Sequence, residues 1–286
     1  MWWLSLGVSF ANVNDPDPNL AADVGVGGAV RANPGSFAAA MTAPAVLALS
    51  PRYCIGFGGR VGTSQTRRLD AGAIDSMTGP ISLGAVFARE SLKRDATVDE
   101  LPGWLEDTSD ILNPQTHNAV AGALAVSWLQ RRLAVGIGGR YWQYSSRFVE
   151  ADQKYQAQVS VAGRLRDGIY LSLSGENLLP MQWDFAQPQL GTAIRLDKKG
   201  VASLSVDLVT ALRDDPGLSS LSAGTELWVG EFLPLRFGYQ RDFAAQEDAI
   251  SAGIGTGTEQ AILEYGANLT LGSLEHVHAL SLRFFL

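Results

Sequence analysis

The sequence has little cysteine, little charge and no long apolar run. Cys54 is the only cysteine in 286 residues, which excludes an intrachain disulfide and a cysteine-based zinc cluster. Charged residues make up 18% of the chain, below the roughly 25% of soluble domains. No window approaches the roughly 18 consecutive apolar residues that a membrane helix needs. If the chain spans a membrane, it does so as a β-barrel, the other structure that satisfies all backbone polar groups.

Residues in patterns typical of catalytic, metal or cofactor sites are equally scarce. His117, His276 and His278 are the only histidines, and the last two share one strand face at a spacing compatible with a metal pair. No partner ligand is fixed beside them, because Glu275 faces the other way, so an ordinary pair at a strand end is the alternative. No serine lies in a Gly-x-Ser-x-Gly context. The stretch "GVGGAV" lacks the strand–helix unit and the acidic residue of a dinucleotide site. We predict a non-enzyme with no catalytic residue, metal or cofactor.

The net charge of −7, with only short runs of like charge, gives no reason to expect a nucleic-acid partner. What the chain has in excess is glycine, at 31 residues, against a usual share of about 7%. Strands that present small side chains to a crowded interior are consistent with this composition.

Alternation is the strongest pattern. In "VASLSVDLVTAL", residues 201–212, apolar Ala202, Leu204, Val206 and Leu208 alternate with polar residues. This period of two predicts a strand with one apolar and one polar face. About fourteen such segments follow one another from residue 51, and an even number is typical of bacterial outer-membrane barrels.

The connections between these segments alternate in length. A barrel inserted from one side of a membrane has one rim of tight turns and one rim of longer loops, whereas a soluble sandwich has no reason to keep this order. Tight joints fall at 130–131, 166–168, 197–199 and 230–231, and longer ones at 91–115, 177–189 and 213–219.

The polar faces carry isolated charges that would be costly in a protein core but are ordinary in a lumen. We therefore predict that the apolar faces meet lipid and that the charged residues line the lumen as a transport path: Arg60, Arg140, Arg164, Arg195, Glu226, Arg236, Glu264 and Arg283. Aromatic residues near strand ends are expected in interfacial girdles, with ordinary strand-favouring aromatics as the alternative for about half of them, namely Trp128, Tyr141, Trp142, Tyr144 and Tyr239.

The N-terminal 50 residues differ from the rest. Residues 1–11 end in Ser9-Phe10-Ala11, a pattern acceptable to signal peptidase, but lack a basic start, so they are either the remnant of an export signal or mature sequence. Residues 12–50 contain two Asp-Pro steps, a glycine cluster and an Ala-rich run after Asn33-Pro34-Gly35 that favours a short helix.

Several motifs together resemble the FadL/PorV-like outer-membrane barrels. "GVGGAVRANPGSFAAAMTAPAVLALSPRYCIGFG" resembles their N-terminal region, in which a Gly-rich stretch, an Asn-Pro step and a small helix lead into the first strand. "LSLSGENLLP" resembles a strand ending in Asn-Leu, here Asn177-Leu178. "AGTELWVGEFLPLRFGYQRD" resembles their late hairpin, and "HALSLRFF" their terminal strand.

This resemblance implies a fourteen-stranded up-and-down barrel over 51–286, with the segment 12–50, including Asn33 and Pro34, folded inward as a hatch. FadL-type members take up hydrophobic small molecules. PorV-type members serve a secretion apparatus as a partner or cargo-handling subunit.

Three functions follow as hypotheses. The first is a porin-like barrel in the outer membrane of a Gram-negative bacterium that conducts or hands over hydrophobic or amphipathic substrates. The second is a plugged structural barrel that anchors a larger envelope or secretion complex. The third is a soluble β-sandwich or solenoid that acts as a binding module. The first two predict a lipid bilayer as partner, joined by a hydrophobic ligand or by envelope subunits.

Overall fold

The computed structural model describes most of the chain, namely residues 20–63, 66–92, 115–145, 152–179, 187–198, 201–213, 216–230 and 232–286. The expected export-signal remnant at 1–11 and the first part of the hatch, 12–19, lie outside the described residues.

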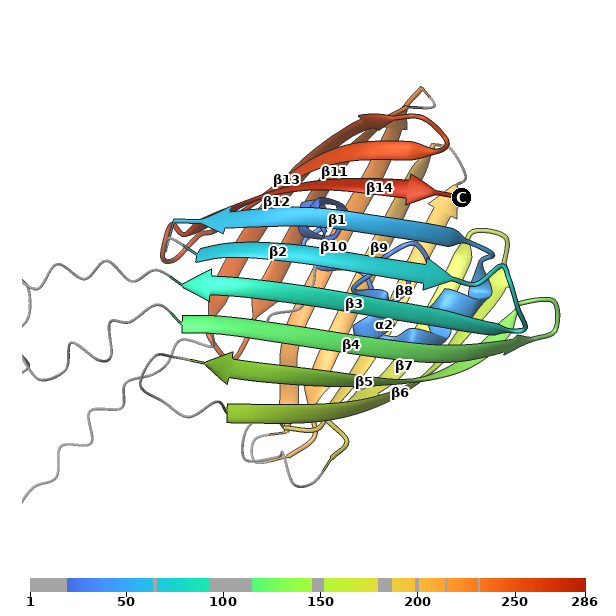
Figure 1. The fold of residues 1–286 in the computed structure, drawn as a ribbon, viewed down its shortest axis with the longest axis horizontal. Coiled ribbons are helices and arrows are strands. Elements are labelled where there is room, and N and C mark those ends of the chain that lie inside the picture. Colours follow the sequence, from blue (N-terminus) through green and yellow to red (C-terminus); the bar gives the residue numbers. More distant parts are fainter. Residues whose placement is uncertain are drawn as a thin grey trace, which may run out of the picture.

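Three short helices precede fourteen strands (Figure 1). The helices are α1 (Ala21–Gly25), α2 (Ala39–Thr42) and the 3-10 helix η1 (Pro44–Leu49). The strands are β1 (Tyr53–Gly62), β2 (Thr66–Asp75), β3 (Ile81–Leu92), β4 (Gln115–Trp128), β5 (Leu133–Ser145), β6 (Asp152–Arg166), β7 (Ile169–Glu176), β8 (Gln189–Lys198), β9 (Ala202–Ala211), β10 (Gly217–Val229), β11 (Leu233–Asp242), β12 (Glu247–Gly257), β13 (Ala261–Thr270) and β14 (His276–Phe285).

The strands form a closed antiparallel barrel in which each pairs with its neighbours in sequence. Closure comes from β1 and β14, whose register places Cys54 opposite Phe285 and Gly62 opposite Val277. Closure leaves no sheet edge with unpaired backbone groups, as a membrane barrel requires. The barrel of about fourteen strands predicted from alternation is confirmed, with fourteen strands in up-and-down order.

The two faces of the wall differ in the way that alternation predicts. In β9, Ser203, Ser205 and Asp207 are buried inside the barrel, while Leu204 and Leu208 are 48% and 38% exposed outside it. The same order holds in strand after strand, so the large exposed side chains are mostly leucine, isoleucine, valine and aromatic residues on the outer face. Since acyl chains solvate such a surface and water does not, the barrel is of the transmembrane type.

None of the described helices has both the length and the apolar character needed to cross a membrane.

The two rims of the barrel also differ in the length of their connections, as expected. Strands β6 and β7 are joined through 167–168 and β8 and β9 through 199–201, whereas the opposite rim carries the connections 93–114 and 177–188.

One aromatic prediction is wrong. Tyr141 and Trp142 are adjacent in β5, so they cannot both face lipid, and Trp142 is the one that faces inward, 1% exposed. The Arg140 guanidinium carbon lies 5.1 Å from the centroid of its ring. Trp128 and Tyr239 are exposed, at 48% and 38%. The side chain of Tyr144 lies outside the described residues.

Candidate functional site

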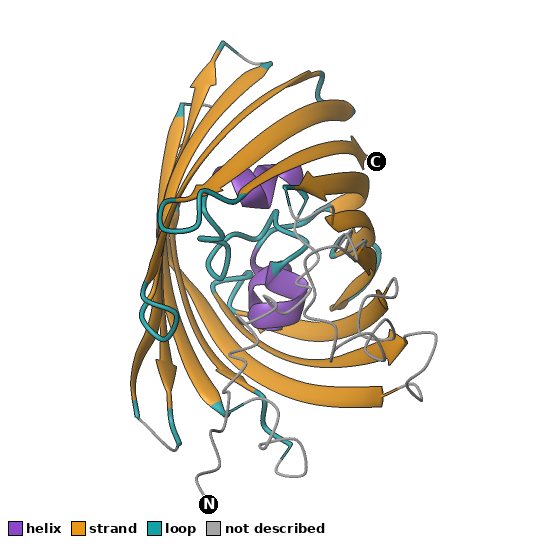
Figure 2. Ribbon diagram, turned by 90° about the vertical axis from the view of Figure 1, so that its left-hand side faces the viewer, coloured by secondary structure: helices purple, strands orange, loops and turns teal. Residues whose placement is uncertain are grey.

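Residues 20–50 fill the middle of the barrel as a compact plug (Figure 2). Nearly every side chain between 20 and 49 is buried. Helix α1 lies beside β12 and β13, and η1 lies beside β4, β5 and β6. The alanine-rich run expected to be helical forms α2 and η1. Its small side chains allow the backbone to approach the wall on several sides.

Glycines on the inner face of the wall make room for the plug. A methyl group at Gly56 would lie 2.7 Å from Leu20 and 2.8 Å from the Phe37 ring. One at Gly136 would overlap the backbone of Ala45, and one at Gly266 the carbonyl of Ala21. These contacts explain part of the glycine excess, because any side chain at such positions would occupy the place of the plug.

Polar side chains of the wall hold the backbone of the plug at separate points. Ser160 Oγ accepts a hydrogen bond from the Ala45 amide at 2.8 Å, and Ser281 Oγ accepts one from the Ala21 amide at 3.2 Å. Carbonyl groups are bound as well, since Gln158 Nε2 donates to Ala40 O at 3.1 Å. These bonds satisfy buried backbone groups that would otherwise lack a partner.

A carboxylate provides another anchor. Asp207 Oδ2 accepts the amide hydrogens of Val30 and Arg31, each at 2.8 Å. The Arg31 guanidinium reaches Glu176, with Nη2 at 2.9 Å from Oε1. Two neighbouring donors thus converge on one buried carboxylate from the wall, which binds this turn of the plug with charge-assisted hydrogen bonds.

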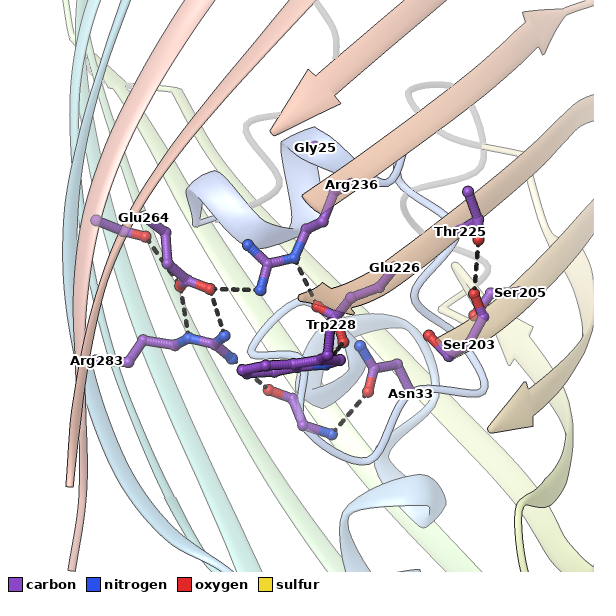
Figure 3. A network of polar contacts seen from close by, with 12 residues as sticks. Gly25, Asn33, Ser203, Ser205, Thr225, Glu226, Trp228, Arg236, Glu264 and Arg283 are labelled. Carbon is purple, nitrogen blue, oxygen red and sulfur yellow. Dashed lines mark hydrogen bonds and ion pairs between the residues drawn. The ribbon is translucent and has the colours of Figure 1, made fainter. Parts of the chain in front are cut away.

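A network of four charged residues lies inside the barrel toward the short-turn rim (Figure 3). Glu264 is fully buried and receives Arg283 through two bonds, Nε to Oε2 at 2.7 Å and Nη2 to Oε1 at 2.6 Å. Arg236 bridges the two acids, with Nη2 at 2.7 Å from Glu264 Oε1 and Nε donating to Glu226 Oε2 at 2.6 Å. The paired hydrogen bonds of the guanidinium groups and the pairing of every charge offset the desolvation cost of burying these residues.

This network also touches the plug. Arg283 Nη1 donates to the carbonyl of Gly35 at 3.4 Å, and Gly25 packs beside the Arg236 side chain. Asn33, predicted as part of the hatch, accepts the Gly35 amide at 3.0 Å and so stabilises the turn that contains Pro34. The turn and the network therefore position each other.

Asp23 of α1 is a buried acid on the plug. Burial raises its pKa to about 6, while a hydrogen bond with Ser36 and the charge of Arg283 oppose the increase. Its Oδ2 atom has no hydrogen-bond partner. A proton on Asp23 therefore stabilises the docked plug.

A second charged group lies toward the long-loop rim. Arg68 Nε donates to Asp70 Oδ1 at 2.8 Å, Arg60 Nε is 3.6 Å from Asp70 Oδ2, and Arg68 Nη1 is 3.8 Å from Glu90 Oε2. The two charged groups thus lie toward opposite rims of the barrel.

The residues predicted to line the lumen fall into different surroundings. Arg195 lies 4.0 Å from Glu226 and 3.4 Å from Asp197, at the edge of the first network. Arg140 donates from Nη2 to Met41 O at 3.0 Å and so binds the plug. Arg164 instead donates to Gln130 O at 3.3 Å in a short turn, so it belongs to the rim.

Sequence reasoning missed the anchors of the plug. Asp207, Ser160, Gln158 and Ser281 all lie on polar faces that alternation identifies, but nothing local distinguishes an anchor from any other inward residue. Among the described residues there is no group of three or more histidine, cysteine or acidic side chains that could hold a metal ion. His276 and His278 pack edge to face at 5.3 Å, and His278 Nδ1 lies 2.6 Å from the Tyr265 hydroxyl.

No protein-family model matches the sequence, and no curated protein does either. Solved structures with a similar fold include the CymD monoaromatic hydrocarbon channel, with a TM-score of 0.67 at 10% identity over 94% of this chain and 97% of that one. The Pseudomonas putida toluene transporter TodX has a TM-score of 0.57 at 9% identity over 87% and 93% of the two chains. The Acinetobacter baumannii outer-membrane protein Omp33 has a TM-score of 0.50 at 9% identity over 84% and 100%. At these identities the likeness concerns the fold, and the chain has the fold of an outer-membrane barrel.

Proposed function

We propose that this protein resides in the outer membrane of a Gram-negative bacterium and conducts or hands over hydrophobic or amphipathic substrates past the plug formed by residues 20–50. The short-turn rim faces the periplasm and the long-loop rim faces outward, as in barrels inserted from the periplasmic side.

The observation that carries this proposal is the way in which the plug is held. Its body is apolar and alanine-rich, and it is fastened by separate bonds from side chains such as Ser160, Asp207 and Ser281 to its backbone. Releasing these bonds would not break the ladder that closes the wall, because that ladder runs between the strands alone. A plug of this kind can move while the barrel stays closed.

The substrate class follows from two considerations. The buried face of the plug that packs against the wall is apolar over Leu20, Phe37, Met41 and Leu47, next to Cys54 of β1, and a substrate passing a displaced plug would meet this face. The similar structures named above include a monoaromatic hydrocarbon channel and a toluene transporter, which supports an apolar substrate here. The charged residues, including Arg60, Arg140, Arg195, Arg236 and Arg283, would then line the path on either side of the plug.

A specific observation favours a second candidate function, a plugged structural subunit that anchors a larger envelope or secretion complex. The plug meets wall glycines such as Gly56, Gly136 and Gly266 at contact distance, so it fits the lumen closely. A permanent seal would have such a fit.

Locking the plug to the wall separates the two functions. In a Cys54→Ser background, the double substitution Ala45→Cys/Ser160→Cys places one thiol on the plug and one on the wall at a point of contact, because the Ala45 amide donates to Ser160 Oγ at 2.8 Å. The variant is reconstituted into proteoliposomes, and uptake of toluene and of oleate is measured first with the protein oxidised and then with it reduced. Ala45→Cys alone is the control.

For the transport function, we expect uptake in the reduced form, loss of uptake on oxidation and no effect of oxidation on the control. Absence of uptake in every form, together with stoichiometric partners in native-membrane purifications, would replace it with the structural role.

A further inference from the structure

The outer wall has a groove that is separate from the lumen. It crosses β2 to β5 and has a volume of about 550 Å³. Its floor is a row of small residues in direct cross-strand register, Ala73 opposite Ala85, Ala85 opposite Gly122 and Gly122 opposite Gly139. No atom lies within 4 Å of the place that a Cβ would take at Gly122. The floor is therefore open to the membrane.

Large side chains border this floor on both sides. Toward the short-turn rim, Leu83, Leu124 and Ile137 lie in register and are 47%, 47% and 57% exposed. Toward the long-loop rim the register row is Phe87, Val120, Tyr141 and Tyr155, in which the two tyrosine rings lie 5.1 Å apart. An apolar groove whose floor is one small residue wide has the width of an acyl chain.

A polar ladder lies beyond the aromatic row, on the same outward face. Its members are in register across four strands, Arg89 opposite Asn118, Asn118 opposite Gln143 and Gln143 opposite Gln153. Four residues at about 3.4 Å each separate the ladder from the groove floor, or about 14 Å along a strand. This distance is within the length of a lipid acyl chain.

The ladder has unpaired positive charge. Arg89 and its diagonal neighbour Arg67 on β2 are exposed, and within the described part of the chain neither forms an ion pair with a carboxylate. Guanidinium groups bind phosphate through paired hydrogen bonds, and the neighbouring amides can donate to and accept from sugar hydroxyls.

We propose that this surface binds one phosphorylated saccharolipid of the outer leaflet, of the lipid A type, with its phosphate and sugar on the ladder and an acyl chain in the groove. The choice of leaflet rests on the orientation given under the proposed function, in which the long-loop rim faces outward. Charge complementarity favours an anionic headgroup over a zwitterionic one, and the groove ties that headgroup to a lipid.

Native mass spectrometry of the detergent-solubilised full chain tests this site with bis-phosphorylated lipid A, monophosphorylated lipid A and phosphatidylethanolamine as probes. We expect bis-phosphorylated lipid A to bind most tightly, monophosphorylated lipid A less tightly and phosphatidylethanolamine most weakly, in the order of decreasing negative charge. The double variant Arg67→Gln/Arg89→Gln should bind it about tenfold more weakly and lose the preference, a change of about 1.4 kcal/mol.

Gly122→Leu adds a side chain to the floor of the groove, at a position where its Cβ meets no atom within 4 Å, and should weaken binding of all lipid A forms by about tenfold. The matched control is Ala252→Leu, which adds the same side chain to the exposed outer face of β12 and should change nothing.

Equal binding of phosphatidylethanolamine and lipid A, or equal effects of Gly122→Leu and Ala252→Leu, would overturn the proposal. Both readouts are independent of transport. Loss of uptake with intact lipid binding would count against the proposed function alone, and the reverse would count against the lipid site alone.

Discussion

The inner and outer faces of the wall are built from the same strands, but polar side chains are buried on the inner face and apolar side chains are exposed on the outer one. Inside, serines, charged residues and glycines are buried against the plug, as Ser160 and Glu264 show. Outside, Ile137 and Phe237 are more than half exposed. In a soluble protein the apolar set would be the buried one. The reversal shows that the solvent of the outer face is lipid, whereas the polar side chains of the inner face are buried against the plug.

The largest expected effect is on the inner face, at Asp207. Asp207→Ala removes the acceptor of the Val30 and Arg31 amides and an opposite charge near the Arg31 guanidinium. Leaving two buried amides without an acceptor costs about 1–3 kcal/mol each, so we expect the plug to undock and conductance in planar bilayers to rise. Ser205→Ala serves as the control, because Ser205 lies on the same face and its hydroxyl accepts a hydrogen bond from Arg195 rather than from the described part of the plug. Unchanged conductance would mean that Asp207 is not an anchor.

A charge on the outer face should have the next largest effect. Ile137 is 57% exposed in the outward set of β5. Ile137→Arg places a cation among acyl chains, and we expect a loss of about 2–4 kcal/mol in the free energy of unfolding, measured by urea titration in lipid vesicles. Ile137→Leu should be nearly neutral. If the arginine variant were equally stable, the outer face would not be in lipid.

The plug itself should respond to pH through Asp23. Its pKa is raised in the docked state from 3.8 to about 6, so the docked plug binds a proton more tightly than the free one. Docking is therefore favoured at low pH and weakens as pH rises from about 4 to 6, by about 3 kcal/mol in all. Protease accessibility of the plug should increase over this window in the wild type. Asp23→Asn should reduce this pH dependence, and a profile unchanged by the substitution would assign the response to another group.

The smallest expected effect compares two glycines of adjacent strands. Gly136→Ala adds a methyl group that overlaps the Ala45 backbone, whereas at Gly122 the same methyl group meets open space. We expect a loss of about 1–3 kcal/mol for Gly136→Ala and almost none for Gly122→Ala, measured as the thermal unfolding of each variant. Similar losses at both sites would show that strand propensity, rather than contact with the plug, decides their cost.

Much of the wall was predictable because strand alternation is a local property. Leu204 and Leu208 on one side and Ser203 and Asp207 on the other can be assigned to faces without knowledge of any partner strand. Trp142 was assigned wrongly because its residue type and its place near a strand end were used in place of alternation. An aromatic residue near a strand end suggested a girdle, but its neighbour Tyr141 already occupied the outward position.

The interior could be predicted only in part. Glu226, Arg236, Glu264 and Arg283 were recognised as inward charges, but their ion pairs join residues of different strands, up to 28 positions apart for Arg236 and Glu264. No sequence pattern states that Arg236 lies between two acids. The same holds for Asp207, whose partners in the plug are 176 and 177 residues away.

By itself, the sequence determined the fourteen strands, the division of each into a polar and an apolar face, and the order of short and long connections, because these depend on neighbouring residues and on the solvent that each face requires. Only the tertiary structure decided that residues 20–50 fill the lumen, which wall atoms hold them, and that small residues of four strands align into a groove. These features depend on barrel register and on contacts across the lumen, and therefore on pairs of residues that are far apart in the chain.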